Sequence, residues 1–371
     1  MKTKLLFLVS VCAILASTAC AKDKNYQQRL METVEKDRPT LKDLGKPALT
    51  NPDASMLILM GDTQTYTPKM CNQPVLEMMT AWIAYNIDTL NIKGLLHTGD
   101  IVEYNNQVDY GSVFDQNSKQ QWEWVSHCFK RLDNKIPCIL TTGNHDYSHN
   151  WFSGEESRYT SQFSTYFDPS RNYKTQKAIY RVFTEKHKPQ KLDNVIYKID
   201  MGGQWGEIYV MSLELYPRQE VIEWALKRLE SKRMQGKTVI LLTHSYLAPN
   251  GKLPKDGQIL WEGLVKKAPQ IRLVLSGHYA EFYGSFQGHS AVRTDVNDFG
   301  KNVHSILFDP QCTYGGWNGS GGDGWLRLLE FQPDGKTIKV RTYSVLFGHS
   351  PMTKHYAWRT APYDMFDLTI D

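Results

Sequence analysis

The chain is predicted to adopt an α/β fold, and two patterns in the sequence carry this prediction. Up to about residue 280, short apolar runs of strand length alternate with segments whose apolar residues recur at helical spacing. Beyond that point the chain turns to short strand-like segments separated by turn residues. Strands that alternate with helices form sheets covered by helices, so the first pattern sets the fold class and the second adds further strands.

Three helices are predicted in the first part of the chain. One follows Pro74, one runs from about Lys119 to Leu132, and one follows Pro217. A proline suits the first turn of a helix, because its missing N–H would have no partner there. In the second part, strands are expected at Ser290–Thr294, Val303–Phe308, Trp325–Phe331 and Thr337–Val345. We expect these strands to close a second sheet.

Two segments fit neither pattern. Residues 147–193 lose all long periodicity and are interrupted by Pro169 and Pro189, which predicts a polar insertion or lid. The tract from Gly315 to Gly324 holds six glycines but lacks the GK[ST] ending of a nucleotide-binding loop. A mobile loop at the rim of a site is therefore favoured over a phosphate cradle.

The overall composition is that of a globular protein. Its 371 residues are 41% hydrophobic and 22% charged, enough for one large core or two modest ones. The formal net charge of +4 is close to balance. The basic residues Lys227, Arg228, Lys232 and Arg233 fall on the polar face of a predicted helix. Nucleic-acid binding is therefore not expected.

The N-terminus is typical of a secretory signal peptide. Lys2 and Lys4 precede a largely apolar stretch from Leu5 to Leu15, which is too short for a permanent membrane span. Residues 1–21 are predicted to be removed, and residues 22–371 to form the exported domain. That removal takes away two lysines and no acid, so the net charge falls to +2.

Two cleavage patterns compete at the end of this segment. Ala19 and Ala21 make an A-x-A site, whereas Cys20 could be the acylated first residue of a bacterial lipoprotein. The mature protein is accordingly expected in the periplasm, outside the cell, or anchored to a membrane by an N-terminal lipid. Export would also allow disulfides among Cys71, Cys128, Cys138 and Cys312, although buried free thiols are an equal alternative.

Ligand-type side chains follow five of the apolar runs. These side chains are Asp62, Asp100, Asn144, His244 and His278. The tetrapeptide at 143–146, Gly-Asn-His-Asp, places a metal-ligand amide beside a proton-transferring imidazole. Because the carboxyl ends of parallel strands meet at one edge of a sheet, we expect these side chains to converge. The sequence therefore predicts a metal site.

These motifs, taken in order, resemble those of the calcineurin-like metallophosphoesterases. The resemblance rests on Asp62-Thr63-Gln64, Gly99-Asp100, residues 143–146, His244 and Gly277-His278, and it covers most of the mature chain. It implies a four-layer sandwich in which two mixed β-sheets are flanked by helices. This architecture agrees with the α/β start and β-rich finish predicted from the patterns.

The resemblance also implies one or two divalent metal ions. The ligands that it implies are Asp62, Gln64, Asp100, Asn144, His244 and His278. Asp100 would bridge two ions, because a carboxylate has an oxygen for each. The mixture of nitrogen and oxygen donors favours Mn, Zn or Fe over Mg or Ca.

The sequence departs from the usual family pattern at the Asp62 ion. Gln64 replaces a histidine, and Ala280 replaces the second histidine of the GH-x-H motif. An alanine methyl group has no lone pair, so this ion is expected to be weakly held or to await a phosphate. A substitute ligand could come from His97, Glu281 or His289, among which the sequence does not choose.

His145 is the predicted general acid, because the adjacent Asn144 is the ligand and the imidazole can point toward the leaving oxygen. Related phosphatases often carry an aspartate near Glu103 that hydrogen-bonds this histidine. A carboxylate there would raise the pKa of His145 and keep it protonated. Asp146 is the alternative for this orienting role.

The predicted function is hydrolysis of a phosphate ester, with a metal-bound hydroxide as nucleophile and His145 as general acid. Two alternatives stay open: a phosphodiesterase rather than a monoesterase, and a non-catalytic protein that binds metal or phosphate. The expected partner is a phosphorylated small molecule or macromolecule. A membrane would be contacted only through the N-terminal lipid, and the oligomeric state is left open.

Overall fold

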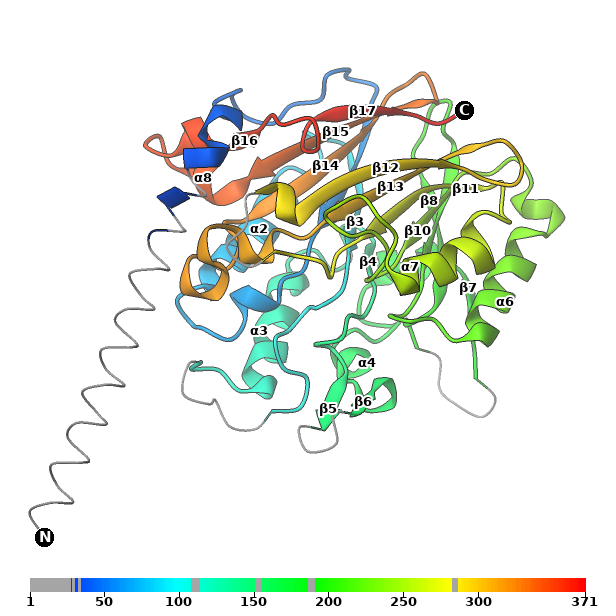
Figure 1. Ribbon diagram of the computed structural model, residues 1–371, viewed down its shortest axis with the longest axis horizontal. Coiled ribbons are helices and arrows are strands. Elements are labelled where there is room, and N and C mark those ends of the chain that lie inside the picture. Colours follow the sequence, from blue (N-terminus) through cyan, green and yellow to red (C-terminus); the bar gives the residue numbers. More distant parts are fainter. Residues whose placement is uncertain are drawn as a thin grey trace, which may run out of the picture.

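Figure 1 shows the computed structural model of the protein. The structure describes Gln28 and the residues 31–32, 35–107, 114–150, 155–185, 191–281 and 286–371. The predicted signal peptide and its two cleavage sites lie outside the described residues. In the part of the chain that is described, no helix is both long and apolar enough to cross a membrane.

The first sheet contains strands from both ends of the described chain. Its order is β1 (Leu41–Lys42), β16 (Trp358–Arg359), β15 (Thr337–Ser344), β14 (Trp325–Phe331), β2 (Ser55–Met60), β3 (Ile92–His97) and β4 (Cys138–Leu140), with β17 (Phe366–Thr369) also paired to β15. Strands β2, β3 and β4 are mutually parallel, whereas β14 runs antiparallel to β2. The sheet is therefore mixed.

The second sheet is built around a parallel core. Its order is β12 (Ser290–Val296), β13 (Asn302–Phe308), β11 (Ile271–Ser276), β10 (Val239–Leu242), β9 (Glu207–Ser212), β8 (Val195–Asp200) and β7 (Ile179–Val182). Strands β9, β10, β11 and β13 are parallel, and antiparallel strands flank them on both sides. A separate hairpin pairs β5 (Ser148–Asn150) with β6 (Glu155–Ser157).

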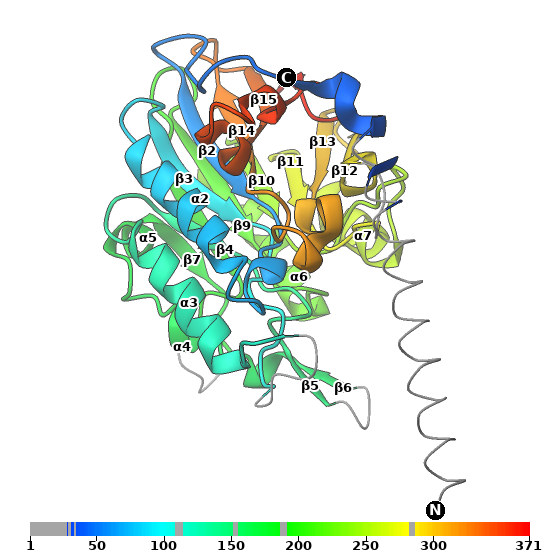
Figure 2. The same cartoon turned by 90° about the vertical axis from the view of Figure 1, so that its left-hand side faces the viewer.

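Helices flank both sheets (Figure 2). The described helices are α2 (Gln73–Tyr85), α3 (Ser118–Lys130), α4 (Phe163–Tyr166), α5 (Tyr173–Ala178), α6 (Gln219–Leu229), α7 (Lys255–Leu260) and α8 (Val345–His349). Short 3₁₀ segments lie at Arg38–Thr40, Gln64–Tyr66, Arg158–Thr160, Lys232–Met234, Phe286–His289 and Lys354–Tyr356, and a π-helical turn spans Trp261–Val265. The segment Pro310–Asn318 contains helical turns interrupted by non-helical residues from Thr313 to Gly316. The three helices predicted from the sequence are all present, as α2, α3 and α6.

Two hydrophobic cores hold the layers together. The first packs α2 and α3 on the first sheet and fills the space between the sheets, and the second packs α6 and α7 on the far face of the second sheet. Strand β10 is apolar throughout because both of its faces are buried. Ile240 and Leu242 pack in the first core, and Val239 and Leu241 pack in the second. The predicted α/β sandwich of two mixed sheets flanked by helices is confirmed.

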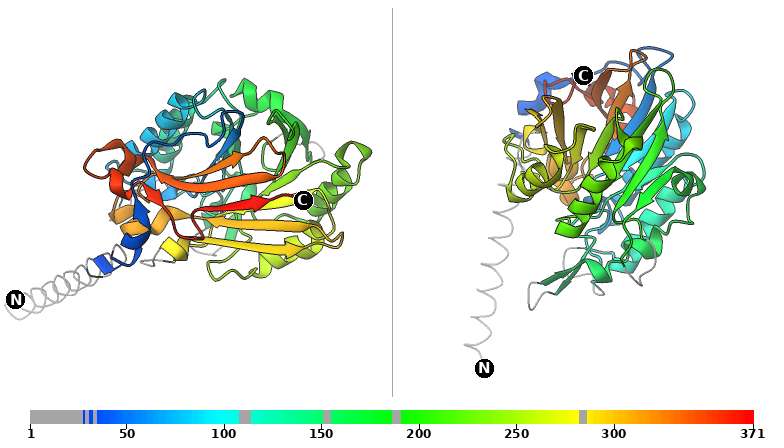
Figure 3. Two further views of the ribbon diagram at one scale, coloured as in Figure 1. Left: turned by 90° about the horizontal axis from the view of Figure 1, so that it is seen from above. Right: turned by 90° about the vertical axis from the view of Figure 1, so that its right-hand side faces the viewer.

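The C-terminal strands differ from the prediction in their placement. Only β12 and β13 join the second sheet, whereas β14 and β15 return to the first sheet beside β2. Seen from above, β15 and β17 lie alongside β12 and β13 (Figure 3). At this edge the two sheets are linked by a hydrogen bond of 3.0 Å between His304 Nε2 and the Thr369 carbonyl. The pairing partner of a strand is a non-local property that its own residues do not encode.

The predicted insertion at 147–193 contains short elements. It holds the β5–β6 hairpin, α4, α5 and the edge strand β7. The last of these pairs with β8, so this part of the segment belongs to the second sheet. The four cysteines Cys71, Cys128, Cys138 and Cys312 are free, and all but Cys71 are buried.

A buried group of charges, which we call the arginine cluster, lies between the two sheets. It consists of Asp37, Arg327, Arg359 and Asp364. Asp364 accepts from both guanidinium groups, at 3.3 Å from Arg327 and 3.2 Å from Arg359. Asp37 lies 3.4 Å from Arg359. The cluster thus joins β14 and β16 to the segment that precedes β1.

Candidate metal centre

Five of the six predicted ligands lie just beyond the carboxyl ends of strands, and the sixth, Gln64, begins the 3₁₀ segment that follows Asp62. Asp62 follows β2, Asp100 follows β3, Asn144 follows β4, His244 follows β10 and His278 follows β11. We call these five residues the strand-end cluster. Since β2, β3 and β4 are parallel, and so are β10 and β11, each sheet brings its own ligands to one edge.

His244 is the hub of this cluster. Its Nδ1 lies 2.8 Å from the Thr98 carbonyl, which can only accept, so Nδ1 carries a proton and Nε2 is the nitrogen left to bind an ion. Around Nε2 lie Asp100 Oδ2 at 3.2 Å, His278 Nδ1 at 3.1 Å and Asn144 Oδ1 at 3.3 Å. Four atoms that can each bind a metal ion therefore face one another.

This donor set fits a divalent metal ion. Ligand atoms of Asp100, His244 and His278 lie within 4.8 Å of one another. Facing lone pairs repel unless a cation lies between them, and buried charges are normally paired or coordinated to metal. A carboxylate, an amide oxygen and two imidazoles suit Mn, Zn or Fe.

Asp62 and Gln64 form the second half of the centre. Asp62 is buried, and its oxygens accept from Thr98 Oγ1 at 2.7 Å and from the His278 main-chain N–H at 2.9 Å. Gln64 is also buried, and it is near enough to the Glu103 carboxyl to lower the pKa of that group, although burial is the larger effect and raises it. Its own Oε1 has no hydrogen-bond partner among the described residues. An orphaned carbonyl oxygen is the group that the sequence predicted to face an ion.

Two glycines make room for the carboxylates. A Cβ on Gly143 would collide with Asp100 Oδ1, and a Cβ on Gly277 would collide with Asp62 Oδ1. The ligands Asp100 and His278 adopt positive φ angles of 50° and 71°. Aspartate and histidine tolerate this left-handed conformation better than most residues, and it turns each side chain sharply off its strand.

Burial and neighbouring charges determine which groups of the strand-end cluster carry a proton. Burial opposes ionisation of Asp100, but the nearby imidazoles, His244 first, hold the pKa of its carboxyl well below the usual range. Burial also disfavours the charged form of His244, yet Asp100 and Asp62 raise its pKa to about 10. Burial and the proximity of His244 lower the pKa of His278 to about 3. Without an ion, a proton on His244 therefore balances part of the carboxylate charge.

His145 lies beside this centre and is partly open to solvent, with 30% of its side chain exposed. Its main-chain N–H donates to Asp100 Oδ1 at 2.9 Å, which fixes the residue to the cluster. Its Nδ1 donates to the main-chain carbonyl of Glu103 at 2.7 Å. Burial alone would lower the pKa of His145, but Asp100 and Glu103 raise it.

Glu103 lies beside His145 as expected, but the hydrogen bond between them involves its main-chain carbonyl. The carbonyl oxygen of Glu103 accepts from His145, whereas its carboxylate Oε2 lies 3.8 Å from Nδ1. Burial raises the pKa of this carboxyl to about 7. Asp146 instead accepts from the main-chain N–H groups of Ile101 and Gly143, at 2.8 and 2.9 Å. It ties together the two loops that carry Asp100 and Asn144.

Comparison with known proteins agrees with this site. A family model described as calcineurin-like phosphoesterase matches residues 56–282, a span that holds all five residues of the strand-end cluster. The chain belongs to the calcineurin-like phosphoesterase family. Members of this family typically bind divalent metals, and Asp100, His244 and His278 are a candidate site for one.

Individual relatives of this phosphoesterase domain are distant. The uncharacterised protein YvnB of Bacillus subtilis (strain 168) is 29% identical over 309 residues, which are 79% of this chain and 20% of YvnB. The chain thus spans about a fifth of that relative's length. Among solved structures, GAP50, the anchor in the inner membrane complex of Plasmodium, aligns with a TM-score of 0.45 and 10% identity over 86% of this chain and 89% of GAP50. PhoD aligns with a TM-score of 0.44 and 12% identity over 88% of this chain and 72% of PhoD.

The three candidate substitutes for the missing family histidine lie in different surroundings. His97 is fully buried behind the site, and its Nε2 and Nδ1 are engaged by Thr63 Oγ1 at 3.0 Å and the Gly99 N–H at 3.1 Å. Glu281 is exposed at the surface. The third, His289, is buried near Arg359, and burial followed by that positive charge lowers its pKa to about 3.

The sequence reasoning missed Asp309, although the signal that found the other ligands also marks this residue. Asp309 follows the apolar strand β13, which is parallel to β11 and adjacent to it. It is fully buried, and burial raises the pKa of its carboxyl to about 6 although its hydrogen bonds with Gln311 act in the opposite direction. The strand Val303–Phe308 was predicted, but the residue at its end was not examined as a ligand because the family motif stops at His278.

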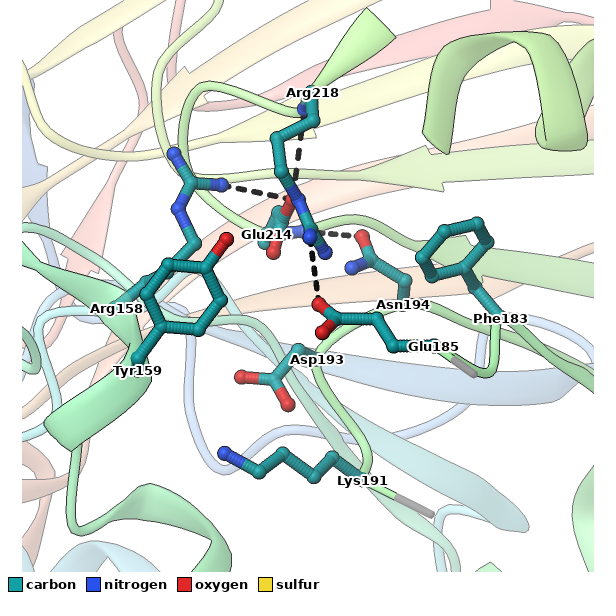
Figure 4. A pocket seen from close by; sticks show the side chains of 9 residues that line it. All are labelled: Arg158, Tyr159, Phe183, Glu185, Lys191, Asp193, Asn194, Glu214 and Arg218. Carbon is teal, nitrogen blue, oxygen red and sulfur yellow. Dashed lines mark hydrogen bonds and ion pairs between the residues drawn. The ribbon is translucent and has the colours of Figure 1, made fainter. Parts of the chain in front are cut away.

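The predicted insertion borders the site. A cavity of about 170 Å³ opens beside His145, and its walls come from the loop after Glu103 and from the start of the insertion. It is lined by Glu103, Tyr104, Asn105, Asn106, Gln107, Asn144, His145, Tyr147 and His149. The insertion is held to the segment between β9 and α6 by two ion pairs, Arg158–Glu214 at 2.8 Å and Glu185–Arg218 at 2.6 Å (Figure 4).

Proposed function

We propose that this protein is a metal-dependent phosphoesterase that uses His145 as the general acid. The single observation that carries the proposal is that ligand atoms of Asp100, Asn144 and His278 all lie within 3.3 Å of His244 Nε2. His145 directly follows Asn144 in the chain. Divalent ions bound there would supply a nucleophile at neutral pH and neutralise phosphoryl charge. Mn, Zn or Fe fits the donor set best.

The protein's own groups would divide the remaining work. His145 Nδ1 donates to the Glu103 carbonyl, which leaves Nε2 as the nitrogen that can pass a proton to the departing oxygen. Asp100 and Glu103 raise the pKa of His145 despite its burial, which favours the protonated form that an acid needs. A protein that only bound metal or phosphate would not need a proton donor such as His145.

The cavity beside His145 indicates the chemistry of the leaving group. Its lining contains amides and aromatic rings, namely Asn105, Asn106, Gln107, Tyr104 and Tyr147, and no lysine or arginine among the lining residues described. Such a wall suits an uncharged, hydrogen-bonding leaving group. We therefore propose a phosphorylated small molecule with a neutral polar leaving group as the substrate.

The test is hydrolysis of a chromogenic phosphate monoester and of the matching diester by metal-stripped protein after Mn, Zn, Fe, Ni or Mg is added back. We expect one ester to be cleaved with one or two of these metals. The His145→Ala variant should lose about 10²–10⁴-fold in kcat, because it lacks the proton donor. Its metal content, measured by elemental analysis, should stay unchanged.

The matched control is His127→Ala, which removes an imidazole that is 60% exposed on α3. It should keep wild-type activity. Full activity of His145→Ala would refute the general-acid role. Binding of phosphate without turnover of either ester, across all the metals, would favour the alternative of a non-catalytic binding protein.

A further inference from the structure

The centre lacks one donor on the side of Asp62. In this chain position 280 is an alanine, whose methyl group cannot bind a cation. Asp62 and Gln64 are buried, and Asp100 is the ligand expected to bridge from the other ion. Gln64 Oε1 is buried without a hydrogen-bond partner among the described residues, so this side of the centre awaits a cation.

Asp309 lies against the loop that carries Asp62. A Cβ built on Gly61 would be 2.8 Å from the Phe308 carbonyl and 3.5 Å from Asp309 Cα, so the two strand ends are in direct contact. The register between β11 and β13 pairs Ser276 with Leu307. Asp309 therefore follows its strand at the same level at which His278 follows β11.

Asp62 and Asp309 are both buried, at 1% and 0% exposure, on chain segments that are in contact. Buried charges are normally paired or coordinated to metal. Two buried carboxylates on neighbouring strand ends are therefore suited to share a cation.

The hydrogen bonds of Asp309 leave it available to such a cation. Its oxygens accept from the Gln311 main-chain N–H at 3.3 Å and from Gln311 Nε2 at 3.0 Å, and both donors belong to one residue. No described lysine or arginine forms an ion pair with it within 4.0 Å. A carboxylate oxygen has more than one lone pair, so these bonds orient the group without exhausting it.

We propose that Asp309 is a ligand of the Asp62–Gln64 ion and takes the place of the donor that Ala280 lacks. The centre then holds two ions, one in a shell rich in nitrogen and the other in a shell of oxygen donors. The inference rests on the proposed function, since it concerns the ions of that same site. It predicts that the second ion prefers Mn over Zn more strongly than the first does.

The first experiment measures metal stoichiometry. Wild-type protein loaded with Mn should retain two ions per chain and show the EPR spectrum of an exchange-coupled pair. In Asp309→Asn the second ion should bind at least about tenfold more weakly, and the spectrum should become that of isolated Mn. The control Gln311→Leu removes the partner of Asp309 but keeps the carboxylate, so it should retain the coupled pair.

A second variant tests direct coordination. In Asp309→Cys loaded with cobalt, a thiolate ligand would produce a sulfur-to-cobalt charge-transfer band that wild-type protein lacks. The band supports the assignment even if Asp309→Asn fails to fold, and its absence from a folded, cobalt-loaded variant overturns it. Two Mn ions of unchanged affinity in Asp309→Asn would also overturn it.

These outcomes separate the inference from the proposed function. If wild type binds a coupled pair of ions, Asp309→Asn binds one, and neither hydrolyses an ester, then the ligand assignment stands and the phosphoesterase proposal fails. If esters are cleaved while wild type holds a single ion at saturation, the proposed function stands and the inference about Asp309 is wrong.

Discussion

The molecule contains two buried groups of carboxylates, and they are neutralised in different ways. In the arginine cluster, Asp37 and Asp364 are balanced by Arg327 and Arg359, whose side chains are fully buried. In the strand-end cluster the described partners of Asp62 and Asp100 are imidazoles, hydroxyls and main-chain N–H groups. A guanidinium group keeps its proton in a protein, whereas an imidazole can give it up to a metal ion.

This difference indicates separate roles for the arginine cluster and the strand-end cluster. The arginine cluster joins β14 and β16 to the segment that precedes β1. Its two carboxylates are balanced by two guanidinium groups. The strand-end cluster reaches neutrality only with protons or cations that can exchange with solvent. We therefore expect the first to determine stability and the second to determine metal binding, and three experiments test this division.

The largest effect should come from the arginine cluster. Replacing Arg359 by Met removes the ion pair of Asp37 at 3.4 Å and one of the two ion pairs of Asp364, which keeps only Arg327. The free energy of unfolding should fall by about 3–5 kcal/mol, as measured by urea denaturation. Lys198→Met breaks an ion pair of 2.6 Å whose side chains are 43% exposed, and it should change stability by less than about 1 kcal/mol. Equal effects of the two variants would contradict the division.

A smaller effect on stability should follow removal of metal from the strand-end cluster. An ion that binds only the folded state at 100 times its Kd adds about 2.7 kcal/mol, and a chelator removes this contribution. The loss is limited because His244, whose pKa is about 10 without an ion, can take up a proton beside Asp100. The melting temperature with and without chelator measures the effect, and binding of Mn should release protons to the buffer. Equal melting temperatures with and without the chelator would show that no stabilising ion is bound.

The smallest effect concerns the proton on His145. Burial opposes its charged form, but Asp100 and Glu103 raise its pKa, so an acid that must be protonated loses activity as the pH rises through that pKa. Glu103→Gln removes one of the two negative charges and should move the alkaline limb of kcat/KM to lower pH by about one unit. Glu123→Gln on α3, where the side chain is 55% exposed, should leave the limb in place. A limb that stays fixed in Glu103→Gln would contradict the coupling.

The positions of the candidate ligands could be predicted from the sequence because the signal for them is local. An apolar run marks a strand, and the residues that follow it lie at an edge of the sheet whichever strands are its neighbours. Asp62, Asp100, Asn144, His244 and His278 were placed at strand ends in this way, and Asp309 carries the same signal after β13. Contacts between distant segments were harder to predict. The contact of the Glu103 carbonyl with His145 and the return of β14 to the first sheet depend on tertiary packing that no short window of sequence holds.

The glycines at 143 and 277 have a consequence for engineering this protein. Exchange of glycine for alanine is a common route to a more heat-resistant protein, since it reduces the freedom of the unfolded chain. At these two positions the added methyl group would occupy the space of the Asp100 and Asp62 carboxylates. A library selected for thermal resistance alone could therefore lose its metals through substitutions that touch no ligand, and screening for retained metal would keep it functional.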